Sequence, residues 1–220
     1  MINPSYLIIR VNPEIVKDVD EYFKSIIEIA SLDGAELLGH VKSINVEIFE
    51  IGSIPSSSLI LKWKESSEVV NKFWNSKIHQ SIFNRLSLDF RENVTAFIAQ
   101  GLPDEGLINE PIPTIASYDA ATIQNNVSLI IEGTVSKPKV IEEYREILFE
   151  IMIEQKSYYV VLTSSEGIDV LHGKWSEDIF AISRWKSMKS IHEFWYGERY
   201  QNTAIPIRIG AGKFSVIGFR

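Results

Sequence analysis

Five residues in the C-terminal half of the chain combine aromatic surface with polar groups: Tyr144, Trp185, Trp195, Tyr200 and Arg208. A tyrosine hydroxyl can donate a hydrogen bond or a proton, and a guanidinium can hold a carboxylate or an enolate oxygen. Together these side chains could line a cleft that binds a small organic molecule. The same aromatic residues could instead be core side chains whose polar tips are satisfied at the edge of the core. The sequence assigns no catalytic residue.

The other residue types that could do chemistry form no recognisable site. The chain has no cysteine, which excludes disulfides, zinc–thiolate sites and thiol nucleophiles. It has no Gly-x-Ser-x-Gly elbow, and Gly210 and Gly212 precede a predicted strand, the wrong context for a dinucleotide-binding loop. Its four histidines show no metal-ligand spacing, so we expect no metal site and no cofactor. They are His40, His79, His172 and His192.

Composition excludes several classes of partner. The 220 residues carry a net charge of -7 without any basic run, which argues against nucleic acid. The N-terminal residues do not resemble a secretory signal, and the apolar runs are far shorter than the ~20 residues of a membrane helix. With 45% hydrophobic residues the chain can fill a packed core. We expect a soluble, cytoplasmic protein with no nucleic-acid or membrane partner.

The sequence contains a tandem duplication. A shift of 122 positions superposes Trp63 on Trp185, and a one-residue adjustment superposes Trp74 on Trp195. Tryptophan is rare, and two pairs in register are hard to obtain by chance. Because internal repeats decide the architecture, the elements that carry the candidate residues must be read from this repeat.

Both copies predict the element order β-α-β-β-α-β, the α+β ferredoxin-like unit. The first copy predicts strands over 6–11, 36–51 (bent near 42–43), 59–63 and 93–99, with helices after Asn12-Pro13 and over 66–74. The second copy predicts strands over 127–135, 158–171, 178–185 and 213–219, a helix through 140–151 and a helix over 187–195.

The repeat also sets the predicted domains. Residues 1–100 form the first module and 127–220 the second. The segment 101–126 has three prolines, two glycines and no periodicity, which is typical of a linker or wrapping arm. The first strand of each module is apolar on both faces, at 7–9 and 129–131, as in sheets buried on both sides. We therefore expect the two antiparallel sheets to pack face to face as an intrachain pseudo-dimer.

Motifs of the second module resemble a bacterial family of unknown function in the dimeric α+β-barrel superfamily. They are Glu143-Tyr144, Gly173-Lys174-Trp175, the segment Trp195–Gln201, and Arg208 ahead of Gly210-Ala211. The resemblance covers nearly the whole second module. It implies the ferredoxin-like barrel fold and a range of functions, which includes cofactor-free monooxygenases, isomerases, haem-binding enzymes and members without demonstrated activity. Fold alone does not choose among them.

The first module is a degraded copy of the motif. It keeps Glu21-Tyr22 and Gln80 but has His79 where the second module has Tyr200, and Ser87 where it has Arg208. We therefore expect the first module to be mainly scaffold and any site to lie in the second.

Two hypotheses about function stay open at this point. The chain is either a module that binds, and could transform, a small organic molecule in the second module, or a non-catalytic assembly module without a ligand site. A haem role for His192 is a further alternative implied by the superfamily, and the whole chain could form a homodimer. Arg208 separates the two readings: a ligand residue would lack a full internal partner, whereas a structural one would pair with a carboxylate such as Glu143.

Overall fold

The computed structural model describes the chain except for residues 1–2, 13–18, 42–45, 51–56, 108–110 and 119–125. The chain forms two compact units, and neither is a continuous stretch of sequence. Unit 1 contains Met1–Asn45, Ile54–Gly101 and Glu166–Trp175, and unit 2 contains Val46–Ser53, Leu102–Ser165 and Ser176–Arg220.

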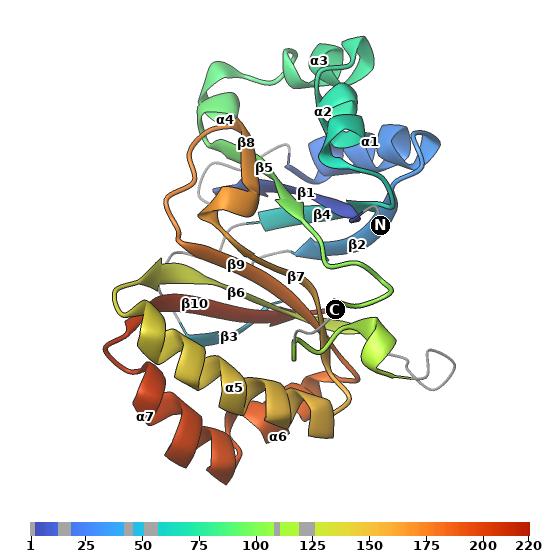
Figure 1. Ribbon diagram of the computed structural model, residues 1–220. Helices are drawn as coiled ribbons and strands as arrows, with labels where there is room; N and C mark the ends of the chain where they lie inside the picture. The colour runs from blue at the N-terminus through green and yellow to red at the C-terminus, as the bar shows by residue number, and fades with distance from the viewer. Residues whose placement is uncertain (1–2, 13–18, 42–45, 51–56, 108–110, 119–125) are drawn as a thin grey trace. The chain divides into compact units, whose positions relative to one another are not determined.

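Unit 1 contains an antiparallel five-stranded sheet in the order β2-β4-β1-β5-β8 (Figure 1). Its strands are β1 (Ser5–Val11), β2 (Glu36–Val41), β4 (Ser57–Trp63), β5 (Val94–Gln100) and β8 (Ile168–His172). The helices α1 (Val19–Leu32) and α2 (Ser67–Trp74) contact these strands, followed in sequence by α3 (Lys77–Phe83) and α4 (Leu88–Glu92).

Unit 2 contains the second antiparallel five-stranded sheet, in the order β3-β10-β6-β9-β7. Its strands are β3 (Glu47–Glu50), β6 (Val127–Val135), β7 (Tyr158–Ser164), β9 (Ile179–Trp185) and β10 (Gly212–Phe219). The helices α5 (Pro138–Glu154), α6 (Met188–Trp195) and α7 (Ile205–Arg208) lie on one face of this sheet (Figure 1).

Four strands of each sheet have the ferredoxin-like order that the repeat predicts, and the fifth comes from the other copy. The strand β3 follows β2 in sequence but pairs with β10, where Glu50 lies opposite Val216. In the same way β8 follows β7 in sequence but pairs with β5. The prediction of one strand over 158–171 is therefore wrong, because the 3-10 turn η4 (Ser165–Gly167) separates two strands of different sheets.

The long helices follow from the spacing of their apolar residues. In α1 the buried side chains are Val19, Tyr22, Phe23, Ile26 and Ala30, which lie on one face of a 3.6-residue period. The helix α5 begins at Pro138, a residue whose fixed φ suits the first helical turn. The predicted start of α1 at Asn12-Pro13 and the predicted bend near 42–43 fall wholly or partly outside the described residues.

Several short helical segments around the candidate site were not predicted for the second copy. A π-helical turn, η5 (Tyr200–Ala204), runs directly into α7, and Gly210 then adopts a φ of +75° before β10. A segment of four or five residues contains barely one turn, too little for an apolar period to show in the sequence.

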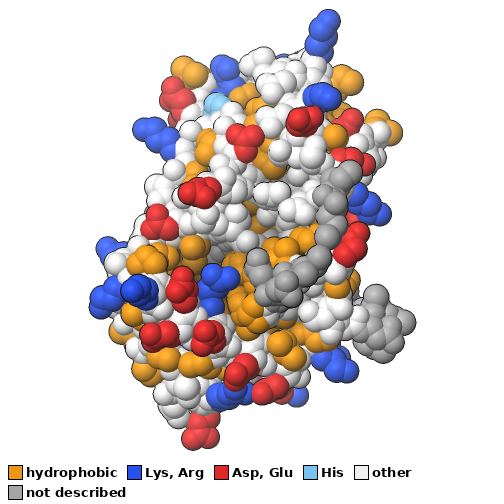
Figure 2. Space-filling model, viewed as in Figure 1, with side chains coloured by type: hydrophobic (Ala, Val, Ile, Leu, Met, Phe, Trp, Pro, Cys, Tyr) orange, Lys and Arg blue, Asp and Glu red, His pale blue; other side chains and the backbone are white. Residues whose placement is uncertain are grey.

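Burial and surface charge agree with the sequence patterns. Leu7, Ile8 and Ile9 are each 0% exposed, so consecutive side chains on opposite faces of β1 are both covered. Acidic and basic side chains are interspersed on the face shown in Figure 2. No helix within the described residues is long and apolar enough to cross a membrane.

Candidate functional site

Tyr144 and Tyr200 are brought together by the packing of α5 against η5. Their hydroxyl oxygens lie 2.8 Å apart in a hydrogen bond, and both residues are buried. Burial raises the pKa of both hydroxyls above the usual range for tyrosine. The pair therefore stays protonated at neutral pH, and each hydroxyl can act as a hydrogen-bond donor.

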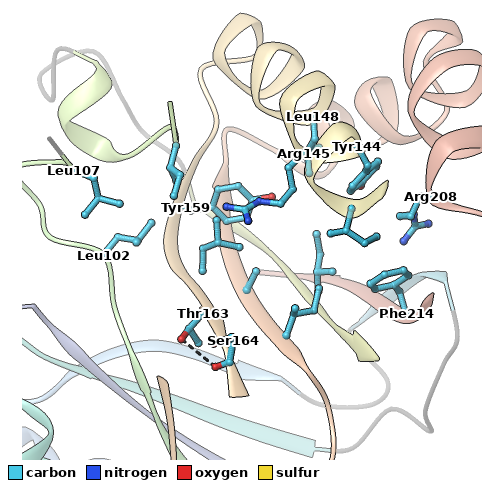
Figure 3. Close-up of a pocket in the computed structure, with 16 residues that line it drawn as sticks. Leu102, Leu107, Tyr144, Arg145, Leu148, Tyr159, Thr163, Ser164, Arg208 and Phe214 are labelled. Carbon is cyan, nitrogen blue, oxygen red and sulfur yellow. Dashed lines mark hydrogen bonds between the residues drawn. The ribbon is translucent and has the colours of Figure 1, made fainter. Parts of the chain in front are cut away.

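Arg208 is the last residue of α7, and Figure 3 shows it on the same side of the cavity as Tyr144 and Phe214. Its guanidinium carbon lies 5.7 Å from the ring centre of Tyr144, 5.6 Å from that of Trp195 and 4.9 Å from that of Phe214. Its Nη2 donates to a carboxylate oxygen of Glu50, on the exchanged strand β3. Arg208 thus has an internal acidic partner, as a structural role requires, and this partner is Glu50 where Glu143 was expected.

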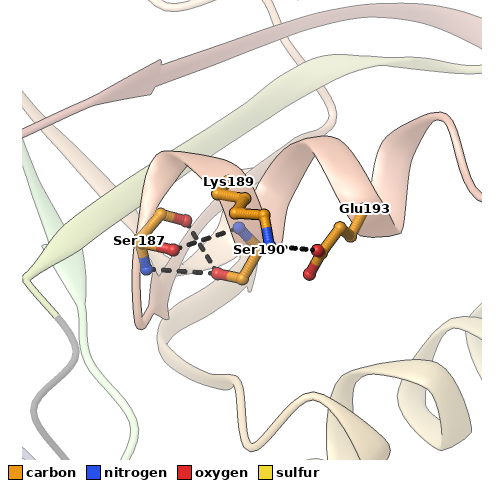
Figure 4. A network of polar contacts seen from close by, with 4 residues as sticks. All are labelled: Ser187, Lys189, Ser190 and Glu193. Atoms are coloured by element: carbon orange, nitrogen blue, oxygen red, sulfur yellow. Dashed lines mark hydrogen bonds and ion pairs between the residues drawn. The ribbon is translucent and has the colours of Figure 1, made fainter.

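The helix α6, whose last residue is Trp195, is fixed by hydrogen bonds at both of its ends. At the start of the helix, Ser187 Oγ accepts from the Ser190 backbone N–H and the Ser187 N–H donates to Ser190 Oγ, both at 3.1 Å (Figure 4). After its end, Gln201 Nε2 donates to the Trp195 carbonyl oxygen at 2.5 Å. This second bond fixes the turn that presents Tyr200 to Tyr144.

Trp185 belongs to the core of unit 2. It is 1% exposed, its ring packs 4.8 Å from that of Phe194, and its Nε1 donates to Ser183 Oγ at 2.8 Å. Its polar tip is therefore satisfied inside the protein, as the packing interpretation of the aromatic residues expects.

A cavity of about 310 Å³ lies between α5 and the adjoining face of the sheet in unit 2. Two of the five predicted residues, Tyr144 and Arg208, line it, whereas Trp185, Trp195 and Tyr200 do not contribute to its lining (Figure 3). The lining residues are Leu102, Leu107, Ile112, Ile131, Ile141, Tyr144, Arg145, Leu148, Tyr159, Leu162, Thr163, Ser164, Ile179, Ala181, Arg208 and Phe214.

The segment between the repeats supplies part of the cavity wall. Leu102, Leu107 and Ile112 belong to it, and they line the cavity together with α5 and β7. The segment is attached to β7 by main-chain hydrogen bonds, from the Leu102 N–H to the Val160 oxygen at 2.9 Å and from the Tyr159 N–H to the Pro113 oxygen at 2.8 Å. A stretch expected to be a linker or wrapping arm therefore helps to build the candidate site.

Four of the six polar residues of the lining were not predicted as site residues: Arg145, Tyr159, Thr163 and Ser164. Arg145 follows Tyr144 on α5, within a run of charged residues that is typical of a solvated face. Tyr159 lies in β7 beside Tyr158, in a strand whose apolar pattern is explained by packing alone. Neither Arg145 nor Tyr159 has a counterpart in the recognised motif, so no signal in the sequence singled them out.

The corresponding region of unit 1 lacks the tyrosine pair. Tyr22, the counterpart of Tyr144, has a buried hydroxyl with no hydrogen-bond partner among the described residues, and its ring packs 5.6 Å from that of Phe90. His79 takes the place of Tyr200 and bonds through Nδ1 to the Trp74 carbonyl oxygen at 2.7 Å. Burial lowers the pKa of His79 to about 4, so this side chain is neutral at neutral pH.

Ser87 and Gln80 show what the first copy has lost and kept. Ser87, at the sequence position of Arg208, caps α4 by accepting from the Phe90 N–H at 3.1 Å. Gln80 Nε2 donates to the Trp74 carbonyl oxygen at 2.8 Å, the same contact that Gln201 makes in the second copy. The turn is thus preserved in both copies, while the polar side chains it presents have diverged.

The remaining histidines make local contacts. His172 Nε2 bonds to the Arg91 carbonyl oxygen at 2.8 Å, His40 lies 3.7 Å from Asp20, and His192 pairs with Glu47. His192, which the superfamily resemblance suggested as a haem ligand, is not part of the cavity lining. Within the described part of the chain, no three His, Cys, Asp or Glu side chains form a group that could hold a metal ion.

Comparison with known proteins identifies the fold. No protein-family model and no curated protein matches the chain. The structure of a candidate monooxygenase from Lactobacillus acidophilus NCFM is similar over 99% of this chain and 93% of that chain, with 11% identity and a TM-score of 0.50. A chlorite dismutase from Candidatus Nitrospira defluvii, solved with imidazole, covers 98% of this chain and 90% of its own, with 7% identity and a TM-score of 0.44.

An anthrone oxidase-like protein is also similar, over 100% of this chain and 92% of that chain, with 13% identity and a TM-score of 0.43. The similarity to the monooxygenase structure, together with the strand order of the two sheets, shows the fold: two α+β modules of the ferredoxin-like type, as the repeat predicts. Likeness at this level of identity concerns the fold and does not assign a reaction. The narrower resemblance to one bacterial family of unknown function is supported by no family model.

Proposed function

We propose that this protein binds a small, predominantly apolar organic molecule in the cavity of unit 2. The supporting observation is the cavity itself, whose volume of about 310 Å³ falls at the lower end of the range found for ligand sites. Ten of its sixteen lining residues are Leu, Ile, Ala or Phe, and the remaining six carry the polar groups. An apolar wall with a few polar groups is the usual composition of a small-molecule site.

The cavity favours ligand binding over a role in assembly alone. Protein interiors are close-packed, so side chains kept only for packing would fill this space. Tyr144 also offers a donor to a bound molecule. When Tyr200 donates to the Tyr144 oxygen, the Tyr144 hydrogen is left free to donate to an oxygen of the ligand.

A neutral fluorescent probe tests the proposal. N-phenyl-1-naphthylamine, an uncharged two-ring aromatic amine, should bind the wild-type protein with a fluorescence increase that saturates at one probe per chain. Leu148→Trp, which places a larger side chain into the cavity from α5, should weaken this binding at least about tenfold. Leu162→Trp on β7 is a second cavity-filling variant, and circular dichroism identifies the variants that fold.

Ile153→Trp is the matched control, because Ile153 is on the same helix but 48% exposed. It should bind the probe as the wild type does. Absence of saturable binding to the wild-type protein, or equal binding to both folded cavity-filling variants, would overturn the proposal.

A further inference from the structure

The two arginines of the cavity differ in how their charges are already compensated. Arg208 donates to Glu50, and its side chain is only 7% exposed. Arg145 forms no ion pair with any described residue, and its guanidinium carbon lies 5.3 Å from the ring centre of Phe149. An incoming anion would have to share Arg208 with Glu50, whereas the charge of Arg145 is available.

Tyr159 supplies a second group next to Arg145. Both side chains line the cavity, Arg145 from α5 and Tyr159 from β7, and they overlap in the view of Figure 3. Arg145 also acts electrostatically on the Tyr159 hydroxyl, where burial raises the pKa and the nearby positive charge opposes that rise. Tyr159 is 3% exposed, and its hydroxyl forms no hydrogen bond within the described chain.

An unpaired guanidinium and an unpaired phenol donor are the combination that an acidic group requires. The guanidinium offers a charge and several N–H donors, and the protonated phenol adds one O–H donor. The nearest acidic residues of α5, Glu142 and Glu146, are exposed and absent from the cavity lining. The rest of the lining includes Ile131, Leu162 and eight other apolar residues, which suit a hydrocarbon body.

We infer that the ligand of this cavity is an apolar organic anion, such as an aromatic or aliphatic carboxylate, whose acidic group is bound by Arg145 and Tyr159. The inference rests on the proposed function and names its ligand class. It moves the anion-binding role from Arg208, where the sequence placed it, to Arg145. Arg208 then forms the buried end wall, held by Glu50 and three aromatic rings.

A matched pair of probes separates this inference from the proposed function. The dye 1-anilinonaphthalene-8-sulfonate has the same skeleton as N-phenyl-1-naphthylamine and adds one sulfonate group. The wild-type protein should bind the sulfonate more tightly than the neutral probe. Arg145→Met should weaken sulfonate binding about tenfold or more and change binding of the neutral probe less than about twofold.

Tyr159→Phe should weaken sulfonate binding about threefold to tenfold, because it removes one donor and retains the ring. Lys139→Met is the control, because Lys139 is exposed on the same helix and its substitution changes the net charge equally. It should leave both affinities unchanged.

The possible failures are distinct. If the wild type binds neither probe, the proposed function is wrong. If the neutral probe binds in the cavity but Arg145→Met affects both probes equally or neither, ligand binding stands and the assignment to Arg145 is overturned. Displacement of the sulfonate by decanoate, but not by decan-1-ol, would further support a carboxylate ligand.

Discussion

At the scale of single residues, Arg208 is held by one acidic partner and three aromatic rings. Replacing it with Met would remove the partner of Glu50 and the cation shared by three aromatic rings. We expect Arg208→Met to lower the free energy of unfolding by about 2–4 kcal/mol. This is less than the largest losses for a fully buried ion pair, because the Glu50 side chain is 33% exposed.

Glu50→Gln tests the same pair from its exposed side. Glu50→Gln should lower the free energy of unfolding by only about 1 kcal/mol, because the amide oxygen can still accept a hydrogen bond from Arg208. Urea unfolding of both single variants and of the double variant would measure the coupling between them. A loss below about 1 kcal/mol for Arg208→Met would contradict a structural role and return this residue to ligand binding.

The two tyrosines at equivalent positions of the repeat, Tyr144 and Tyr22, give a second prediction. Tyr144→Phe leaves the Tyr200 hydroxyl buried without its partner, and we expect it to cost about 1–3 kcal/mol of unfolding free energy. Tyr22→Phe removes a buried hydroxyl that has no partner within the described chain, so it should be neutral or stabilise by about 1 kcal/mol.

Thermal or urea unfolding of the two variants under identical conditions makes the comparison, because each substitution deletes one hydroxyl at an equivalent position of the repeat. The free energy of unfolding should fall in Tyr144→Phe and should stay unchanged or rise in Tyr22→Phe. An equal loss in both variants would show that the contact between Tyr144 and Tyr200 adds nothing to stability.

The candidate site shows how far sequence can reach at this scale. Tyr144 and Arg208, which line the cavity, could be singled out because they belong to the motif of the second module and carry polar groups. Trp185 fitted the same pattern but is a core residue, since an aromatic side chain with a satisfied N–H looks identical in sequence. Arg145 and Tyr159 could not be found, because availability of a charge or a hydroxyl depends on partners that only the fold brings near.

At the scale of elements, α2 and α6 are equivalent helices of the repeat and both have a serine at the N-cap, but only one of these serines makes a capping hydrogen bond. Ser187 caps α6 through its side chain, whereas Ser66, at the start of α2, makes no side-chain capping hydrogen bond. We expect Ser187→Ala to lower the free energy of unfolding by about 1 kcal/mol, and Ser66→Ala to lower it by only about 0.3 kcal/mol. Melting temperatures of the two variants measure the difference, and an equal effect would contradict the role of the cap.

The elements also show the limit of prediction from the repeat. Periodicity located the longer helices and the four strands that form the ferredoxin-like part of each sheet, and Ser187 marked the N-cap of α6. It could not show that β3 and β8 leave their own sheets, because pairing partners are chosen by contacts across long sequence separations. A run of apolar and polar residues over 158–171 is compatible with one strand or with two.

At the scale of the whole molecule, the two exchanged strands link the stability of the units. Strand β8 comes from the second copy but pairs with β5 in unit 1, and β3 comes from the first copy but pairs with β10 in unit 2. Unfolding of either copy therefore removes a strand from the sheet of the other unit. We expect the chain to unfold in a single cooperative transition, although its core is divided between two units.

Hydrogen exchange followed by mass spectrometry tests this coupling on the intact protein. Peptides covering the central strands β1 and β6 should exchange with the same free energy of opening and the same dependence on urea. Val170→Pro, at a 42% exposed position of β8, should weaken the pairing with β5 and lower the protection of β6 as well as β1. The reciprocal variant is Ile48→Pro, at a 40% exposed position of β3, which should weaken the pairing with β10 and lower the protection of β1 as well as β6. Loss of protection in β1 alone after Val170→Pro would show instead that the units open independently. The exchanged strands would then extend each sheet without coupling the stability of one unit to that of the other.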